Sequence, residues 1–392
     1  MQECYLPTGN EWVSLPTLQA RTGALESFSF LHMGYKGLIE QRGGASLPLM
    51  TPFFETEGER ASLQSLTWGR KSDWIPTFCG TAGSLAVEGM LLAPVGERGF
   101  LYQLTVRSTS DKPLSSTFGL EGCWASAWHC VNEDKEIDGA RRCYTSLWND
   151  SLIFDMRCGL PLFAFAPMMD QPCSSTFQET DAGIVYRLAH DCTLEPGQAV
   201  TVTFYWGVGF EEVAAATSAK EMLRQGWQHE LQVTTDWLDA RRWPIPDAQL
   251  ERLYNTNLFF CLFYSAGITL DTEELVLVTS RSPRYYVSAA YWDRDSLLWS
   301  FPTVVDADPA LARRMLDYVF GRQRRNLGVH SRYIDGTVLE PGFELDELMA
   351  PVLALERYVG ATGDRDCLED NAIRSGLTDI LRTLRTKRHR SI

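Results

Sequence analysis

The densest group of residues that could do chemistry lies between positions 284 and 299. It holds five aromatic residues, two carboxylates and two arginines: Arg284, Tyr285, Tyr286, Tyr291, Trp292, Asp293, Arg294, Asp295 and Trp299. Sugars present apolar C–H faces and a rim of hydroxyls, so aromatic planes beside carboxylate acceptors suit a pyranose pocket. Cleavage of a glycosidic bond needs two carboxyl groups, one to protonate the leaving oxygen and one to activate water or attack the sugar. A carboxyl among Trp and Tyr side chains is desolvated, which favours the protonated form that a general acid needs.

A structural explanation also fits this group. Asp293 or Asp295 would then cap the helix that follows, with Arg294 as an ion partner on the surface. Residues two apart on a helix do not share a face, so Asp293 and Asp295 are not expected to face one pocket together. Asp295 stands four positions before Trp299, so the two side chains are expected to lie on the same face of the helix. Because an aromatic neighbour desolvates a carboxyl group, we expect Asp295 to carry the proton.

A second acidic cluster spans residues 340–349 and contains Glu340, Glu344, Asp346 and Glu347. Acidic residues in the first turn of a helix are favoured by the helix dipole, so a structural role again explains the pattern. The functional hypothesis is that Glu344 or Asp346, at a helix start beside a loop, hydrogen-bonds substrate hydroxyls.

The secondary structure that must position these clusters is expected to change from strands to helices near residue 210. Before it, apolar and polar residues alternate, as in Tyr102, Leu104 and Val106, with turns such as 195–197 between the runs. Alternation with period two indicates strands with one buried face, and many short strands predict an antiparallel β-sandwich over residues 1–210.

From residue 211 the apolar residues recur every three or four positions, which predicts one long linker helix over 211–243. After Pro246 the pattern is helical throughout. Asp247 caps a first helix, Asp308 and Pro309 open another over 310–323, and further helices run from about 343 to 359 and from about 366 to 388. Short loops between them predict antiparallel helical hairpins over 244–392.

Two motifs resemble a known family. Tyr-Trp-Asp-Arg-Asp-Ser at 291–296 resembles the Trp-Gly-Arg-Asp-Thr stretch of amylo-α-1,6-glucosidases, the glucosidase part of glycogen-debranching enzymes. It is also similar to the Trp-x-x-Asp-Ser stretch of family 63 α-glucosidases and mannosylglycerate hydrolases. Glu-Leu-Asp-Glu-Leu at 344–348, with Thr-Gly-Asp at 362–364, is similar to their next helix and its exit. The resemblance covers roughly residues 200–385 and implies a β-sandwich, a linker and an (α/α)6 barrel of six helical hairpins.

The resemblance also implies an activity and roles for single residues. It implies a glycoside hydrolase that cleaves an α-linked oligosaccharide by inversion, with Asp295 as general acid and no cofactor or metal. Asp346 would bind substrate in the same subsite, whereas Asp293 stands where the family has Gly and has no counterpart. We expect substrate contacts from a set of residues around the acid: Tyr291, Trp292, Asp293, Arg294, Tyr333, Glu344 and Asp346.

The barrel that the resemblance implies does not fit in the remaining chain. Twelve helices of ~11 residues with their loops need about 200 residues, whereas 148 run from Ile245 to Ile392. In that family the second catalytic carboxylate lies in the later part of the barrel, and no residue here matches it. The sequence thus predicts an incomplete (α/α)6 barrel, inactive or impaired alone, unless a second chain supplies the missing hairpins. If the chain alone were active, Glu344 and Glu347 would be the first residues to test as the second carboxylate.

Two other functions stay open. One is a non-catalytic carbohydrate-binding or scaffold protein. The other is a helical-toroid polysaccharide lyase that uses Tyr286, Tyr333 and His330 to abstract a proton beside a uronate carboxyl. The net charge of −14 disfavours a polyanionic substrate, and it also disfavours nucleic acid.

The sequence also argues against a membrane-spanning protein, a secreted protein and a cysteine-ligated metal site. No apolar run approaches the ~18–20 residues of a membrane span, and the N-terminus shows no secretory signal. The ten cysteines form no Cys-x-x-Cys pair or Cys/His ligand spacing. We therefore expect a cytoplasmic protein with reduced thiols.

Overall fold

The computed structural model describes residues 4–147, 149–158 and 160–387 and divides the chain into two compact units. Unit 1 comprises Met1–Phe30, Ile39–His129 and Lys135–Ala240. Unit 2 comprises Leu31–Leu38, Cys130–Asp134 and Arg241–Ile392. Unit 2 thus includes two short segments that lie far upstream of its helices in the sequence.

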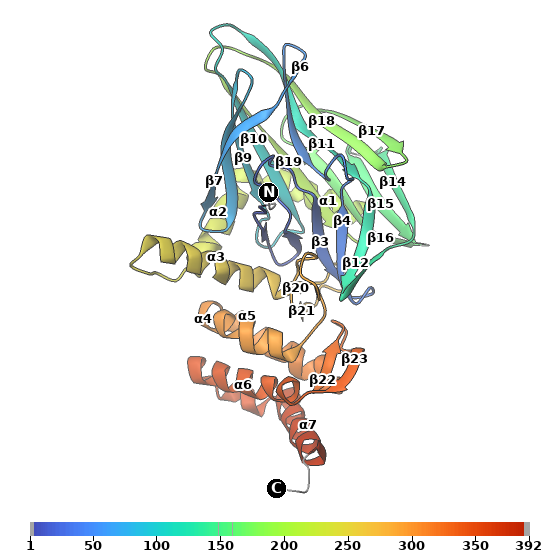
Figure 1. Ribbon diagram of the computed structural model, residues 1–392, viewed down its shortest axis with the longest axis vertical. Helices are drawn as coiled ribbons and strands as arrows, with labels where there is room; N and C mark the ends of the chain where they lie inside the picture. Colours follow the sequence, from blue (N-terminus) through green and yellow to red (C-terminus); the bar gives the residue numbers. More distant parts are fainter. Residues whose placement is uncertain (1–3, 148, 159, 388–392) are drawn as a thin grey trace. The chain divides into compact units, whose positions relative to one another are not determined.

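Three sheets take up most of the first 210 residues (Figure 1). One has the strand order β1 (Thr8–Gly9), β2 (Val13–Leu15), β3 (Ser27–His32), β4 (Gly37–Arg42), β12 (Ser126–Val131), β13 (Glu133–Glu136). The largest has the order β14 (Ala140–Thr145), β15 (Leu152–Cys158), β16 (Leu160–Met169), β19 (Ala199–Gly209), β10 (Gly99–Ser108), β9 (Leu85–Leu92), β8 (Ile75–Ala82), β7 (Leu63–Lys71). The third has the order β17 (Ser174–Thr180), β18 (Gly183–Leu194), β11 (Leu114–Trp124), β5 (Thr51–Thr56), β6 (Glu59–Ala61).

The sandwich that the sequence predicts is present. The alternating run at Tyr102, Leu104 and Val106 lies in β10, and β10 pairs antiparallel with β19, with Tyr102 opposite Phe204. Buried aromatic side chains fill the interior of unit 1: the rings of Phe154 and Phe165 stack 4.8 Å apart, and Trp206 packs against both. Each buried side chain of this size contributes about 1.5–3 kcal/mol, so this aromatic cluster is a main source of the unit's stability.

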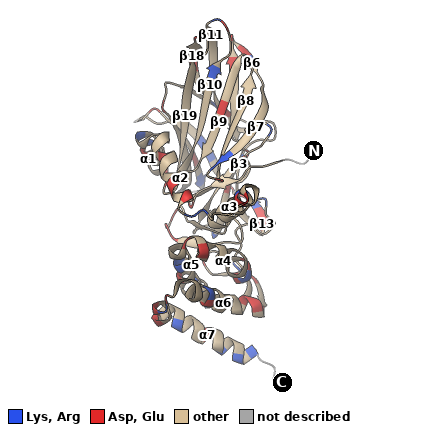
Figure 2. Ribbon diagram, turned by 90° about the vertical axis from the view of Figure 1, so that its left-hand side faces the viewer, with Lys and Arg blue, Asp and Glu red and all other residues tan. Residues whose placement is uncertain are grey.

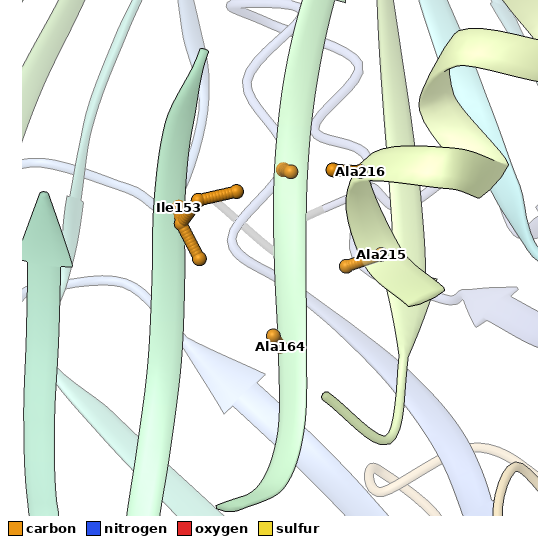
Figure 3. Close-up of a cluster of buried hydrophobic side chains, with 5 residues drawn as sticks. Ile153, Ala164, Ala215 and Ala216 are labelled. Carbon is orange, nitrogen blue, oxygen red and sulfur yellow. The ribbon is translucent and has the colours of Figure 1, made fainter. Parts of the chain in front are cut away.

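Helix α1 (Glu212–Gln225) packs on the largest sheet through small residues. Ala215 and Ala216 face Ile153 and Ala164 across this contact (Figure 3). At Gly209 a Cβ atom would lie 2.5 Å from the backbone nitrogen of Ala215, so glycine is required for this close approach.

The predicted single linker helix over 211–243 is wrong. Two helices occupy this stretch, α1 and α2 (Trp227–Asp239), and Gly226 separates them with φ 84°. A positive φ ends a helix and favours glycine. The helix therefore ends at Gly226, although the apolar period of the sequence continues into the next helix.

Unit 2 contains helices α3 (Ala248–Tyr264), α4 (Phe301–Ala307), α5 (Pro309–Gly321), α6 (Leu345–Thr362) and α7 (Asn371–Lys387). The predicted caps are confirmed: the side chain of Asp247 accepts from the N–H groups of Gln249 and Leu250, and that of Asp308 accepts from Leu311. Basic residues recur along α7 (Figure 2) at Arg374, Arg382, Arg385 and Lys387. The predicted end of this last helix at Arg388 lies outside the described residues.

The expectation that everything after Pro246 is helical is wrong. Two hairpins interrupt the helices: β20 (Ala266–Ile268) with β21 (Leu275–Leu277), and β22 (Val329–Arg332) with β23 (Val338–Phe343). Short 3-10 turns lie at Gln323–Asn326 and Asp366–Glu369. The helix expected from 343 begins at Leu345, because Phe343 ends β23, and it continues to Gly363, which takes the left-handed conformation.

No helix among the described residues is long and apolar enough to cross a membrane. The cysteines whose side chains the structure describes are free thiols.

Candidate active site in unit 2

A π-helix carries the residues on which the chemistry depends. It runs from Arg294 to Ser300 directly before α4, and we label it η1. Its hydrogen bonds join residues five apart, a form that recurs at functional sites. Asp295, Trp299 and Ser300, four and five positions apart, therefore all line one pocket of about 580 Å³. The other residues that line this pocket are Phe260, Thr279, Ser280, Ser282, Arg284 and Tyr285.

Asp295 has the environment of a carboxyl group that retains its proton more readily than usual. Burial raises its pKa, and Arg294, whose Nε lies 3.6 Å from its carboxylate, opposes that rise. The exposed indole of Trp299, with 70% of its surface accessible, and the ring of Tyr285 line the same pocket. The pocket thus combines one carboxyl group with aromatic faces.

Asp293 lies in a different environment. Its side chain is fully buried and pairs with the guanidinium of Arg332, which is also fully buried. The hydroxyl of Tyr291 donates to the Asp293 carboxylate at 2.5 Å, and the guanidinium of Arg332 stacks 4.9 Å from the Tyr291 ring. Asp293 makes no side-chain cap to η1. Asp293 and Tyr291 therefore have a structural role: their side chains are buried beside the start of η1 and do not line the pocket.

Glu347, from the first turn of α6, completes this buried group. Its Oε2 accepts the backbone N–H of Asp293 at 2.6 Å and lies 3.8 Å from Arg332. Burial and then the charge of Asp293 raise the pKa of Glu347 to about 8. Two buried carboxyl groups thus share one buried guanidinium, and Glu347 retains its proton more readily than an exposed carboxyl group does.

Arg294 joins the start of η1 to the start of α6. Its guanidinium donates to Asp346 at 2.8 Å and to Glu344 at 3.1 Å. The hydrogen bond from Arg294 holds the pKa of Asp346 below its usual range. Glu344 also contacts His330, whose Nδ1 lies 2.8 Å away. Three of the predicted substrate-binding residues, Arg294, Glu344 and Asp346, are thus brought together and partly exposed.

The remaining predicted residues lie at the edges of this arrangement. Trp292 is buried, with its ring edge-on to His330 and its indole nitrogen without a hydrogen-bond partner. Tyr333 lies under the amine of Lys36, 5.6 Å from the ring centre. Neither residue lines the pocket that holds Asp295.

The sequence did not reveal the structural roles of two central residues. Arg332 had no predicted role, and Glu347 was considered only as part of an acidic helix start and as a possible second carboxylate, whereas both are buried against Asp293. A buried guanidinium needs a carboxylate partner, but no local pattern indicates that the partner lies 39 positions away at Asp293.

Comparison with known proteins identifies the fold. No family model and no curated protein sequence matches the chain. Among solved structures, it is similar to a putative kojibiose phosphorylase from human microbiome, with TM-score 0.61 and 11% identity, over 96% of this chain and 56% of that one. It is also similar to a bacterial glucoamylase complexed with acarbose, with TM-score 0.54 and 11% identity, over 97% of this chain and 59% of that one. The chain shares its fold with both. It spans just over half the length of either, and the likeness extends over the sandwich and the helices that follow it.

Proposed function

We propose that this chain carries the proton-donating part of an active site that cleaves α-linked saccharides, with Asp295 as general acid. The observation that carries the proposal is the position of Asp295 in a pocket lined by Trp299, Tyr285 and Phe260, where burial raises its pKa. The fold shared with a phosphorylase and a glucoamylase supports a carbohydrate-active enzyme.

The chemistry follows from the pocket's residues. The aromatic faces would stack on the sugar ring, and the carboxyl group of Asp295 would give its proton to the glycosidic oxygen as the C–O bond breaks. Among the described residues that line this pocket, Asp295 is the one carboxyl group. In hydrolysis by inversion a second carboxylate must activate water, so this base would come from residues outside the pocket described here.

Phosphorolysis is the second candidate, and the guanidinium of Arg284 at the same pocket favours it. A phosphate oxygen can attack the sugar carbon without a protein base, while Asp295 protonates the leaving oxygen, giving a sugar 1-phosphate and a free sugar. Arg284 lines the same pocket and would attract the phosphate. The lyase hypothesis gains no support, because His330 lies between Glu344, at 2.8 Å, and Glu340, at 3.6 Å, where a uronate carboxylate would be repelled.

Completion of the site by another chain or segment stays part of the proposal. On α3, Leu250, Leu253 and Tyr254 expose apolar surface at helical spacing. A covering helix would bury this surface, as packed helical hairpins do.

The test measures binding and turnover separately. Calorimetry with acarbose, maltose and kojibiose should show binding to the chain, and Asp295→Asn should change turnover far more than binding. Product analysis with and without inorganic phosphate distinguishes hydrolysis from phosphorolysis. Asp317→Asn, in the same unit but at a different pocket, is the matched control. Binding without turnover in any form of the protein would favour a carbohydrate-binding protein, and absence of both would refute the proposal.

A further inference from the structure

The π-helix η1 begins without a cap of its own. The first N–H groups of a helix have no partner within it and need an acceptor from elsewhere. Asp293 occupies the N-cap position, but its carboxylate is held by Arg332 and Tyr291 and makes no bond to the helix.

Glu347 supplies the acceptors from α6. Its Oε2 accepts the N–H of Asp293 at 2.6 Å, and its Oε1 accepts the N–H of Arg294 at 3.4 Å. The Glu347 side chain is fully buried, so no water replaces these bonds if they are lost. An unsatisfied buried N–H is strongly unfavourable, and the backbone at 293–294 is therefore tied to α6.

We infer that Glu347 is a positioning residue whose buried carboxyl caps the π-helix from α6 and so holds Asp295 and Trp299 toward the pocket. This inference rests on the proposed role of Asp295. Glu347 itself does not line the pocket and would not touch substrate.

The surroundings of Glu347 support a positioning role. Asp346, its neighbour in the first turn of α6, binds the Arg294 guanidinium, so α6 holds both the backbone and the side chain of Arg294. The charged groups that face Glu347 are Asp293, Arg332 and Arg294. Burial and then the charge of Asp293 raise its pKa to about 8, whereas Arg332, the backbone N–H of Asp293 and Arg294 act in the opposite direction.

Hydrogen–deuterium exchange on the full chain tests the inference without requiring activity. Glu347→Ala should speed exchange of the amides of residues 293–300 at least about tenfold, while peptides from unit 1 keep their rates. Glu356→Ala, on the exposed face of the same helix, is the matched control and should leave all rates unchanged. Equal exchange at 293–300 in the two variants would overturn the inference.

Glu347→Gln provides a second variant if the alanine variant does not fold. Its amide oxygen still accepts an N–H, so it should fold with protection at 293–300 near that of the wild type at pH 7. Glu347→Met has a side chain of similar length without an oxygen acceptor and should lose that protection. Equal protection at 293–300 in Glu347→Gln and Glu347→Met would overturn the inference.

Saccharide binding separates this inference from the proposed function. If Glu347→Ala speeds amide exchange at 293–300 and weakens acarbose binding while Glu356→Ala does neither, the capping by Glu347 and the proposed function are both supported. If exchange responds but Asp295→Asn changes no turnover, the capping by Glu347 stands and its consequence for catalysis is refuted together with the role of Asp295.

Discussion

Asp293 and Asp295 are two residues apart, yet their carboxyl groups have opposite environments. Asp293 is fully buried against Arg332, whereas Asp295 lines a pocket of about 580 Å³ beside Trp299. The difference arises because Asp293 precedes the π-helix and Asp295 lies within its first turn, so their side chains leave the backbone in different directions. The Asp293 carboxyl group thus has a structural role, and the Asp295 carboxyl group is accessible from the pocket.

The first prediction concerns Asp295. In a form of the protein that turns over α-glycosides, Asp295→Asn should lower the rate by about 10²–10⁴-fold. The loss should be largest for poor leaving groups, which need protonation, and smaller for activated aryl glycosides. The melting temperature should change little, because Asp295 is only partly buried. A mild effect on all substrates would remove Asp295 from the mechanism.

The second prediction concerns the buried pair of Asp293 and Arg332. Asp293→Asn leaves a guanidinium buried without its main charge partner, which typically destabilises a protein by about 3–5 kcal/mol. Urea denaturation should show this loss. Asp306→Asn breaks an exposed pair with Arg357 at 3.0 Å and should change stability by less than about 1 kcal/mol. Similar small effects in both variants would show that Arg332 finds another partner.

The third prediction concerns the pH dependence of unit 1. Burial, and then the charge of Glu97, raises the pKa of Glu230 on α2 from 4.5 to about 7. The folded state therefore holds this proton more tightly than the unfolded state, and stability falls as the pH rises from about 4.5 through about 7. Each unit of pKa difference corresponds to about 1.4 kcal/mol, so the loss is on the order of 3 kcal/mol.

Glu230→Gln removes this titration. Relative to the wild type, the variant should gain stability on going from pH 5 to pH 8, measured by denaturant unfolding at both values. Glu195→Gln, in the exposed turn between β18 and β19, should show no such relative gain. A parallel pH profile for wild type and Glu230→Gln would contradict the raised pKa.

The fourth prediction concerns the contact between α1 and the largest sheet. Gly209→Ala would place a Cβ atom 2.5 Å from the nitrogen of Ala215, so α1 must shift, which costs about 1–3 kcal/mol. Gly360→Ala, inside α6 with open space around it, should instead stabilise the chain by up to about 1 kcal/mol. Thermal unfolding measures both, and a stabilised Gly209→Ala would show that the contact is loose.

Local patterns were sufficient where the interactions themselves are local. The strand that holds Tyr102, Leu104 and Val106 follows from side-chain alternation, and the caps at Asp247 and Asp308 follow from residues that bond N–H groups two or three positions away. The break at Gly226 also had a local signal, since glycine readily takes a positive φ, but the continuous apolar period outweighed it.

The candidate site depended on contacts that no local pattern contains. The sequence alone pointed to Asp295 among aromatic residues and to the acidic start of α6. Only the tertiary structure decided that Arg332 neutralises Asp293, that Glu347 caps a helix some 50 residues earlier, and that this helix is of the π type. Buried charges and orphaned N–H groups take whichever partner the fold brings near, so their pairing is a property of three-dimensional packing and not of sequence spacing.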